Sequence, residues 1–228
     1  MNIVLIPYRD REEHWKVFKE YLVPLLRKYI KDLKIVLVEQ GDNKKFNRGC
    51  LLNAGFKEYE KEIDFVYHHD VDTMPSEEIV KTLYTKEDYE IVRLSVPHKW
   101  SLGGIVKFKK DVYIDINGFP NNIWGWGIED RALFYRALIK RRKLSQIYNE
   151  HQYGDNEKFR ALYHESNMEN YTGKKKEISD KWDLKKIYKL DLSEREKLVE
   201  EEGLNTVKYE LIKKEKLDKD IEKIIIKI

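Results

Sequence analysis

Residues 64–72 read DFVYHHDVD, a short apolar run that leads into a cluster of histidines and aspartates. The first part of this stretch, residues 64–67, has the length and composition of a buried strand. Two earlier apolar runs have the same character, NIVLIP at residues 2–7 and LKIVLV at residues 33–38. We therefore expect a strand at each of these runs.

The segments between the expected strands have the spacing of helices, at residues 11–29 and 45–59. Strands that alternate with helices favour an α/β fold, with a mostly parallel central sheet flanked by helices. The pattern continues downstream, where we expect strands at residues 91–96 and 103–108 and helices at residues 76–83, 111–116 and 129–140.

The charge and cysteine content narrow the class of protein. Lys and Arg number 44 against 41 Asp and Glu, so the net charge is only +3. Nothing in this balance resembles the basic patch of a nucleic-acid-binding protein, and we expect no nucleic-acid partner. Cys50 is the only cysteine, which precludes an intramolecular disulfide and fits a reducing compartment. No apolar stretch is long enough for a transmembrane segment.

The first candidate site is the triplet Asp70-Val71-Asp72. In parallel α/β sheets, ligands bind beyond the carboxyl ends of the strands, which is where this triplet lies. Two carboxylates that flank one residue can meet a hard divalent cation, which prefers oxygen ligands. The alternative is a solvated turn, and the triplet by itself leaves both interpretations open.

The second candidate site is the stretch NGFPNNIWGWGIED at residues 117–130. Its glycines allow a ligand to approach the backbone closely, and the flat faces of Trp124 and Trp126 suit sugar rings. Glu129 and Asp130 open a helix, whose dipole favours ionised acids that can accept a proton. The alternative is that the tryptophans belong to the core and the acids are helix-terminus charges, but the density of Gly, Trp and acid favours a site.

These motifs carry a resemblance to a known family. The stretch at residues 103–136 resembles the β-1,4-galactosyltransferase family, whose signature is Gly-Trp-Gly-x-Glu-Asp after Asn-Gly-Phe-Pro-Asn-Asn. Residues 7–14 (PYRDREEH) and 46–53 (FNRGCLLN) are similar to its two nucleotide-binding loops, and residues 65–72 are similar to its metal motif. The four blocks occur in the family's order.

The resemblance implies a GT-A fold, a UDP-sugar donor, a saccharide acceptor, Mn²⁺ as cofactor and inversion at the anomeric carbon. It implies that Asp130 is the catalytic base, that Glu129 holds the acceptor and that Trp126 lies against the sugars. By the same match, the nucleotide-sugar pocket is formed by Pro7, Tyr8, Arg9, Arg11, Phe46, Arg48, Asp70 and Val71.

The resemblance also implies a metal site with one departure from the family's pattern. Asp72 matches the metal-binding aspartate, and His164 matches a downstream histidine. The family has a Met or His two or three residues before that histidine, whereas this chain has Ala161 and Leu162. Either a second protein ligand is missing, or it comes from elsewhere, with Glu165 and His151 as candidates.

A second departure concerns the donor sugar. Ser101 lies two residues before the pair Gly103-Gly104, where galactose-specific relatives carry a tyrosine. We expect Ser101 and Gly104, together with Trp126 and Glu129, to influence sugar selectivity. The small Ser101 side chain leaves UDP-GalNAc as an alternative to UDP-Gal.

The resemblance ends near residue 170, where the composition shifts to Lys, Glu, Ile and Leu. We therefore expect a GT-A catalytic domain at residues 1–170, and at 171–228 a helical extension packed on it or partly mobile. Without an anchor or a disulfide, we expect a cytoplasmic location, with a peripheral position at a membrane surface as the alternative. The rival to an enzyme is a catalytically silent sugar- or nucleotide-binding protein.

Overall fold

The structure is a computed structural model that describes residues 1–125, 127–148, 157–163 and 174–228. A mixed eight-stranded sheet forms its centre, in the order β7-β5-β6-β3-β1-β2-β10-β9. The strands of this sheet are β1 (Asn2–Tyr8), β2 (Leu33–Gln40), β3 (Phe65–His69), β5 (Ile91–Ser95), β6 (Ile105–Lys109), β7 (Leu144–Ile147), β9 (Glu210–Lys216) and β10 (Ile221–Lys227). A small antiparallel pair joins β4 (Thr73–Pro75) to β8 (Phe159–Ala161).

The middle of the sheet is parallel, as the alternation of strands and helices predicts. β1 lies between β2 and β3 and runs parallel to both, and β10 continues the parallel arrangement beyond β2. Ile3 and Leu5 of β1 belong to one hydrophobic cluster, whereas Val4 and Ile6 belong to another. Successive side chains of a strand point to opposite faces, so the sheet has a packed core on each side.

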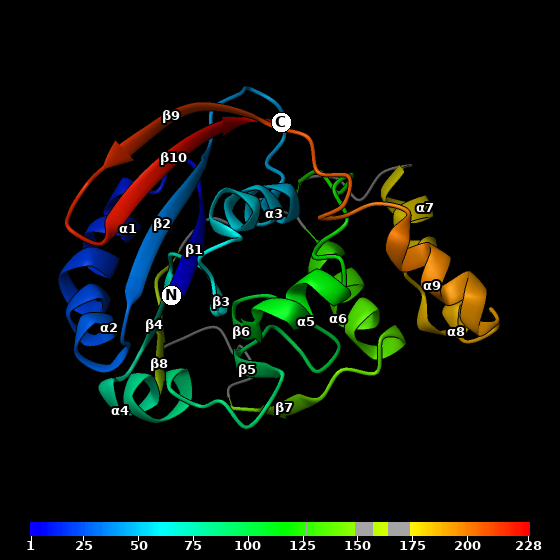
Figure 1. The fold of residues 1–228 in the computed structure, drawn as a ribbon, viewed down its shortest axis with the longest axis horizontal. Coiled ribbons are helices and arrows are strands. Elements are labelled where there is room, and N and C mark those ends of the chain that lie inside the picture. The colour runs from blue at the N-terminus through cyan, green and yellow to red at the C-terminus, as the bar shows by residue number, and fades with distance from the viewer. Residues whose placement is uncertain (126, 149–156, 164–173) are drawn as a thin grey trace.

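Helices cover both faces of the sheet (Figure 1). On one face the core includes residues of α3 (Arg48–Tyr59), α5 (Lys110–Asp115) and α6 (Glu129–Ile139). On the other face a single helical segment runs through α1 (Glu12–Val17), a π-helical turn (Phe18–Leu22) and α2 (Val23–Tyr29). It packs beside α4 (Glu77–Ile79) and the π-helical turn that follows it (Val80–Tyr84).

Two predicted helices begin where a side chain caps them. The helix expected at residues 45–59 begins at Arg48, because the Asn47 side chain accepts a hydrogen bond from the Cys50 amide. The Ser76 hydroxyl accepts one from the Ile79 amide at the start of α4. Both residue types are favoured at helix N-caps because they satisfy otherwise unpaired amides. The cap at Asn47 therefore places Arg48 at the first position of α3.

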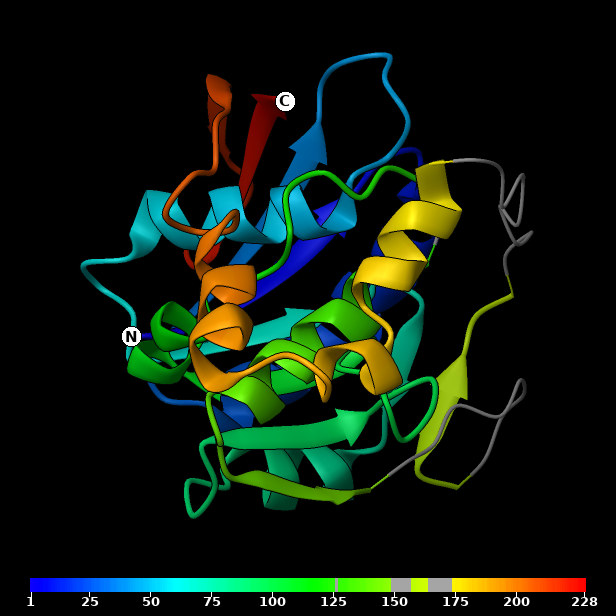
Figure 2. The same cartoon turned by 90° about the vertical axis from the view of Figure 1, so that its right-hand side faces the viewer.

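The prediction of a purely helical extension at residues 171–228 is wrong for its last part. Helices do form at α7 (Lys174–Lys181), α8 (Leu184–Ile187) and α9 (Leu192–Glu200), and Figure 2 shows them in front of α6. Residues 210–227 instead supply β9 and β10 to the main sheet, with Ile221, Ile224 and Ile226 fully buried. β-Branched side chains fit a pleated, buried surface better than a helix, which explains the difference.

None of the helices in the described ranges combines the length and the apolar character needed to cross a membrane.

Candidate active site

Arg48 joins two acidic residues that the sequence had placed in separate motifs. Its Nη1 donates to Oδ1 of Asp130 at 2.7 Å. Its Nε and Nη2 donate to Oδ1 of Asp70 at 3.1 Å and 2.8 Å. These residues come from the start of α3, the start of α6 and the end of β3, so the three motifs meet at the edge of the sheet where a ligand was expected.

The charges at this edge influence one another strongly. Burial disfavours the charged form of Arg48, but the carboxylates of Asp70, Asp130 and Glu129 more than compensate and raise its pKa. Arg48 therefore remains a cation inside the protein.

Glu129 has the opposite environment. Its side chain is buried, and burial together with the charge of Asp130 raises its pKa to about 8. One of its oxygens, Oε2, has no hydrogen-bond partner among the described residues. A buried polar atom without a partner is costly, so Oε2 is a candidate to bind a ligand. At neutral pH the neutral carboxyl can donate a hydrogen bond as well as accept one.

The loop between β5 and β6 lies against the start of α6. The Leu102 amide donates to the main-chain oxygen of Asp130 at 3.1 Å. The Ser101 hydroxyl accepts a hydrogen bond from the Gly103 amide at 3.0 Å. Ser101 is buried, so the selectivity expected of it would act through the shape of this loop. Gly104 has φ of +71°, a conformation that favours glycine and lets the chain turn into β6.

A sharp turn presents the two acids. Gly125, Gly127 and Ile128 all have positive φ values, and α6 begins directly after them. The Gly125 amide donates to the Phe46 main-chain oxygen at 2.7 Å, which ties this turn to a predicted nucleotide-binding loop. Trp124 is half-buried rather than a core residue, with the Lys44 ammonium 5.6 Å from its ring centroid. Trp126 lies outside the described residues.

The first predicted nucleotide-binding loop lies next to the second. Pro7 and Tyr8 are buried at the end of β1. The Arg9 guanidinium lies 5.2 Å from the Phe46 ring centroid and donates to the Lys44 main-chain oxygen at 2.8 Å. Arg11 is half-buried at the start of α1. A guanidinium beside an aromatic ring suits a base and its phosphates.

The structure places Asp72 beside the chain that leads to position 164. The Leu162 amide donates to the Asp72 main-chain oxygen at 2.7 Å, and β4, which follows Asp72, pairs with β8. The Thr73 hydroxyl donates to Oδ1 of Asp72 at 3.2 Å. Val71, between the two aspartates, is buried. His164, His151 and Glu165 lie outside the described residues.

The carboxylate oxygens of Asp72 are ligands of the type that suits Mn²⁺. The described residues contain no group of three or more His, Cys, Asp or Glu side chains that could hold a metal ion. Asp72 therefore fits as one ligand, and the remaining positions would fall to a ligand outside the described ranges or to a diphosphate.

Two residues at this site were not expected from the sequence. Gly103, expected only to begin a strand, directly contacts the Asp130 carboxylate. The Asn53 amide donates to the main-chain oxygen of Phe119 and to Asn121, which holds the 117–130 stretch against α3. The adjacent glycines at positions 103 and 104 indicated a close contact, but the sequence did not show that the contact is with Asp130.

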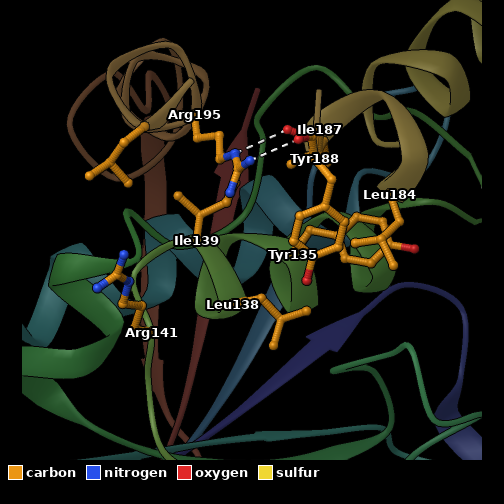
Figure 3. Close-up of a pocket in the computed structure, with 9 residues that line it drawn as sticks. Tyr135, Leu138, Ile139, Arg141, Leu184, Ile187, Tyr188 and Arg195 are labelled. Carbon is orange, nitrogen blue, oxygen red and sulfur yellow. Dashed lines mark hydrogen bonds between the residues drawn. The ribbon is translucent and has the colours of Figure 1, made fainter. Parts of the chain in front are cut away.

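Two pockets lie elsewhere on the molecule. One is lined by Val17, Tyr21, Met74 and Arg160. The other encloses about 180 Å³ between α6, α8 and α9, with Tyr135, Leu138 and Tyr188 among its walls (Figure 3). Arg195 at its rim donates to main-chain oxygens of Ile187 and Tyr188, so that guanidinium caps the end of α8. Neither pocket is lined by Asp130 or Arg48.

The chain is similar in sequence to known glycosyltransferases. Residues 2–86 match the N-terminal region of glycosyl transferase group 7, and residues 86–165 match the N-terminal domain of galactosyltransferase. The chain is 35% identical over 152 residues to β-1,4-galactosyltransferase 1 of Mus musculus, a match that covers 63% of this chain and 38% of that protein. It is also 35% identical over 153 residues to β-1,4-galactosyltransferase 4 of Homo sapiens, covering 63% and 44%.

The fold comparison extends along the whole chain. The crystal structure of a mutant Drosophila β-1,4-galactosyltransferase 7 in complex with manganese, UDP-Gal and xylobiose has a TM-score of 0.78. The match covers 100% of this chain and 93% of that one at 23% identity. The predicted GT-A fold is therefore confirmed. The chain spans less than half the length of the two curated relatives.

Proposed function

Because the chain belongs to the β-1,4-galactosyltransferase family, we propose that it transfers a hexose, with galactose as the first candidate, from a UDP-sugar to a hydroxyl group of a saccharide acceptor. The observation that carries the proposal is the convergence at Arg48 of Asp70, from the metal motif, and Asp130, from the Gly-Trp-Gly-x-Glu-Asp motif. The Drosophila relative that shares the fold binds manganese, UDP-Gal and xylobiose, which are the same classes of ligand.

In the proposed reaction, Asp130 acts as the general base. The acceptor oxygen attacks the anomeric carbon on the face opposite UDP, the bond from that carbon to the diphosphate oxygen breaks, and Asp130 takes the hydroxyl proton. The configuration at the anomeric carbon is thereby inverted. A positioned general base contributes about a hundred- to ten-thousand-fold in rate. The Arg48 guanidinium donates a charge-assisted hydrogen bond to Oδ1 of Asp130, which helps to hold this carboxylate in place.

Glu129 would hold the acceptor in this scheme. Its buried Oε2, without a partner among the described residues, is placed to exchange a hydrogen bond with an acceptor hydroxyl. Trp126 would lie against the sugar rings, as the family resemblance implies. Holding two sugars in one orientation removes much of the entropy cost of a bimolecular reaction.

The leaving diphosphate needs positive charge nearby. Arg9 and Arg11 lie between β1 and α1, and Arg48 lies at the start of α3. Asp72 and His164 would hold Mn²⁺, which supplies further charge neutralisation when it is bound. Pro7, Tyr8, Phe46 and Val71 would enclose the nucleotide.

A second donor deserves a direct test, because Ser101 is small and lies in the loop against Asp130. Ser101 stands where galactose-specific relatives carry a tyrosine, and this buried, smaller residue would change the donor pocket through the shape of the loop. We therefore propose UDP-GalNAc as the alternative donor. The lone Cys50 is free and buried, which suits a reducing compartment such as the cytoplasm.

The deciding experiment is a donor screen. The purified chain is incubated with Mn²⁺, a panel of saccharide acceptors and UDP-Gal, UDP-GalNAc, UDP-Glc or UDP-GlcNAc, and UDP release and product linkage are measured. We expect acceptor-dependent UDP release with UDP-Gal or UDP-GalNAc and a product of inverted configuration. UDP binding without acceptor-dependent release across the panel would instead identify a silent nucleotide-binding protein.

A further inference from the structure

Gly103 is in unusually close contact with the Asp130 carboxylate. A β-carbon at position 103 would lie 2.0 Å from Oδ2, 2.4 Å from Cγ and 2.9 Å from Oδ1 of Asp130. The carboxylate therefore occupies the space that a side chain at position 103 would fill. Gly41 and Gly55 face the ends of apolar side chains instead, and Gly118 and Gly203, which also meet polar atoms closely, have positive φ values that themselves favour glycine.

The backbone at position 103 does not itself require glycine. The glycines with positive φ include Gly104 and Gly127, but not Gly103. An L-residue could adopt the local conformation, so the reason for glycine here is space. This separates Gly103 from its neighbour Gly104, whose φ of +71° makes it a turn residue.

Hydrogen bonds hold both the loop that carries Gly103 and the carboxylate that lies against it. Leu102 is fully buried, and its amide donates to the main-chain oxygen of Asp130 at 3.1 Å. The Ser101 hydroxyl accepts from the Gly103 amide at 3.0 Å. On the other side of the carboxylate, Arg48 donates to Oδ1 at 2.7 Å. The carboxylate is thus confined between a guanidinium and a bare α-carbon.

We propose that Gly103 is a positioning residue for the base, and that the Ser101–Gly103 loop is the surface on which the Asp130 carboxylate rests. This inference rests on the proposed function of Asp130. A general base has to come within about 2.6–3.2 Å of the oxygen whose proton it takes. A methyl group at position 103 would displace the carboxylate by more than 1 Å, because ordinary contacts to a β-carbon begin near 3.4 Å.

The test is a double-mutant cycle with Gly103→Ala and Asp130→Asn, measured as kcat with Mn²⁺ and the best pair of UDP-sugar donor and acceptor from the donor screen. A displacement of about 1 Å can cost on the order of a hundredfold in rate, and we expect that loss for Gly103→Ala in the wild-type background. In the Asp130→Asn background the same change should cost less than threefold, because the base it displaces is already absent. Equal losses in both backgrounds would overturn the proposal.

Two further variants separate positioning from folding. Gly55→Ala is the matched control, because its β-carbon would lie 2.7 Å from Val38 in the core, away from the base. It should lower stability and leave kcat within about twofold. If Gly103→Ala does not fold, Ser101→Ala takes its place. Ser101→Ala removes the oxygen that accepts the hydrogen bond from the Gly103 amide, so we expect kcat to fall several-fold. This loss should vanish in the Asp130→Asn background. A loss of equal size in both backgrounds would count against the proposal.

A structural measurement makes the result independent of turnover. The crystal structures of wild type and of Gly103→Ala, or of Ser101→Ala if the first does not fold, should differ in the place of the Asp130 carboxylate relative to Arg48. For Gly103→Ala the shift should exceed 1 Å, and an unmoved carboxylate in either variant would overturn the positioning role. If the wild type shows no transfer, the proposed function is refuted but the positioning of the carboxylate is not. The place of the Asp130 carboxylate can still be compared between the crystal structures of wild type and variant.

Discussion

Replacing Asp130 by asparagine changes the proposed base with little change in size. Asparagine cannot take the acceptor proton, so kcat should fall by at least about a hundredfold, which corresponds to about 2.7 kcal/mol of transition-state stabilisation. The affinity for UDP with Mn²⁺, measured by calorimetry, should barely change, because Asp130 is not assigned to the nucleotide. The loss should therefore appear in kcat rather than in nucleotide binding.

The structure also sets the expected cost in stability. Removing one partner of a buried ion pair costs about 3–5 kcal/mol when the remaining charge is left alone. Arg48 keeps its hydrogen bonds to Asp70, and the asparagine oxygen can still accept from Nη1. We therefore expect a loss of only about 1 kcal/mol in the free energy of unfolding, the usual worth of one hydrogen bond, by urea denaturation.

Asp115 provides a matched control. It lies in α5 and pairs with Arg142 at 2.6 Å, with the two side chains somewhat more exposed than those of Asp130 and Arg48. Asp115→Asn should lower stability by a comparable amount and leave kcat unchanged. Near wild-type turnover in Asp130→Asn would refute the assignment of the base. A folded Asp130→Asn variant that has lost UDP binding would show that the residue serves the nucleotide instead.

Three other outcomes are expected. Chelation of divalent metal should abolish transfer in the UDP-release assay, and added Mn²⁺ should restore it. Asp72→Asn should stay inactive at moderate Mn²⁺ in the same assay. Full activity in excess chelator would contradict the metal site. Burial raises the pKa of Glu129 from 4.5 to about 8 in the folded chain. Between these two values the folded chain binds more protons than the unfolded chain, so the free energy of unfolding should fall as the pH rises. The slope should reach up to about 1.4 kcal/mol per pH unit. Glu129→Gln should remove that slope in urea titrations at pH 5 to 8, and identical slopes would contradict the raised pKa. Deleting residues 210–228 should prevent folding, as seen by circular dichroism, because three buried isoleucines contribute about 1.5–3 kcal/mol each, comparable to the whole stability of a domain.

The predictions that held came from local patterns. The strands at residues 2–7, 33–38 and 64–67 are continuous apolar runs, and such runs are recognisable because both faces of a parallel sheet are buried. The Asp-x-Asp triplet follows the third strand, so its position at the carboxyl edge also followed from the pattern. The roles of Asp130 and Arg48 were implied by the family resemblance and stay predictions.

The features that were missed depend on contacts between distant segments. Arg48 and Asp130 are 82 positions apart, and only the fold brings their side chains together. The closeness of Gly103 to Asp130 has the same origin. Residues 210–227 were misassigned because lysines and glutamates mask the isoleucines, and their burial depends on a partner strand near the other end of the sequence.

The place of β10 has a consequence for how the chain folds during synthesis. β2 pairs with β10 along its outer edge, and Lys34 and Glu222 of these strands are 188 positions apart. At about 5–20 residues per second, a ribosome needs on the order of 10–40 s to supply the second strand after the first. For that time the edge of β2 is an open template for other chains, and the nascent protein is a natural client for a chaperone that shields it.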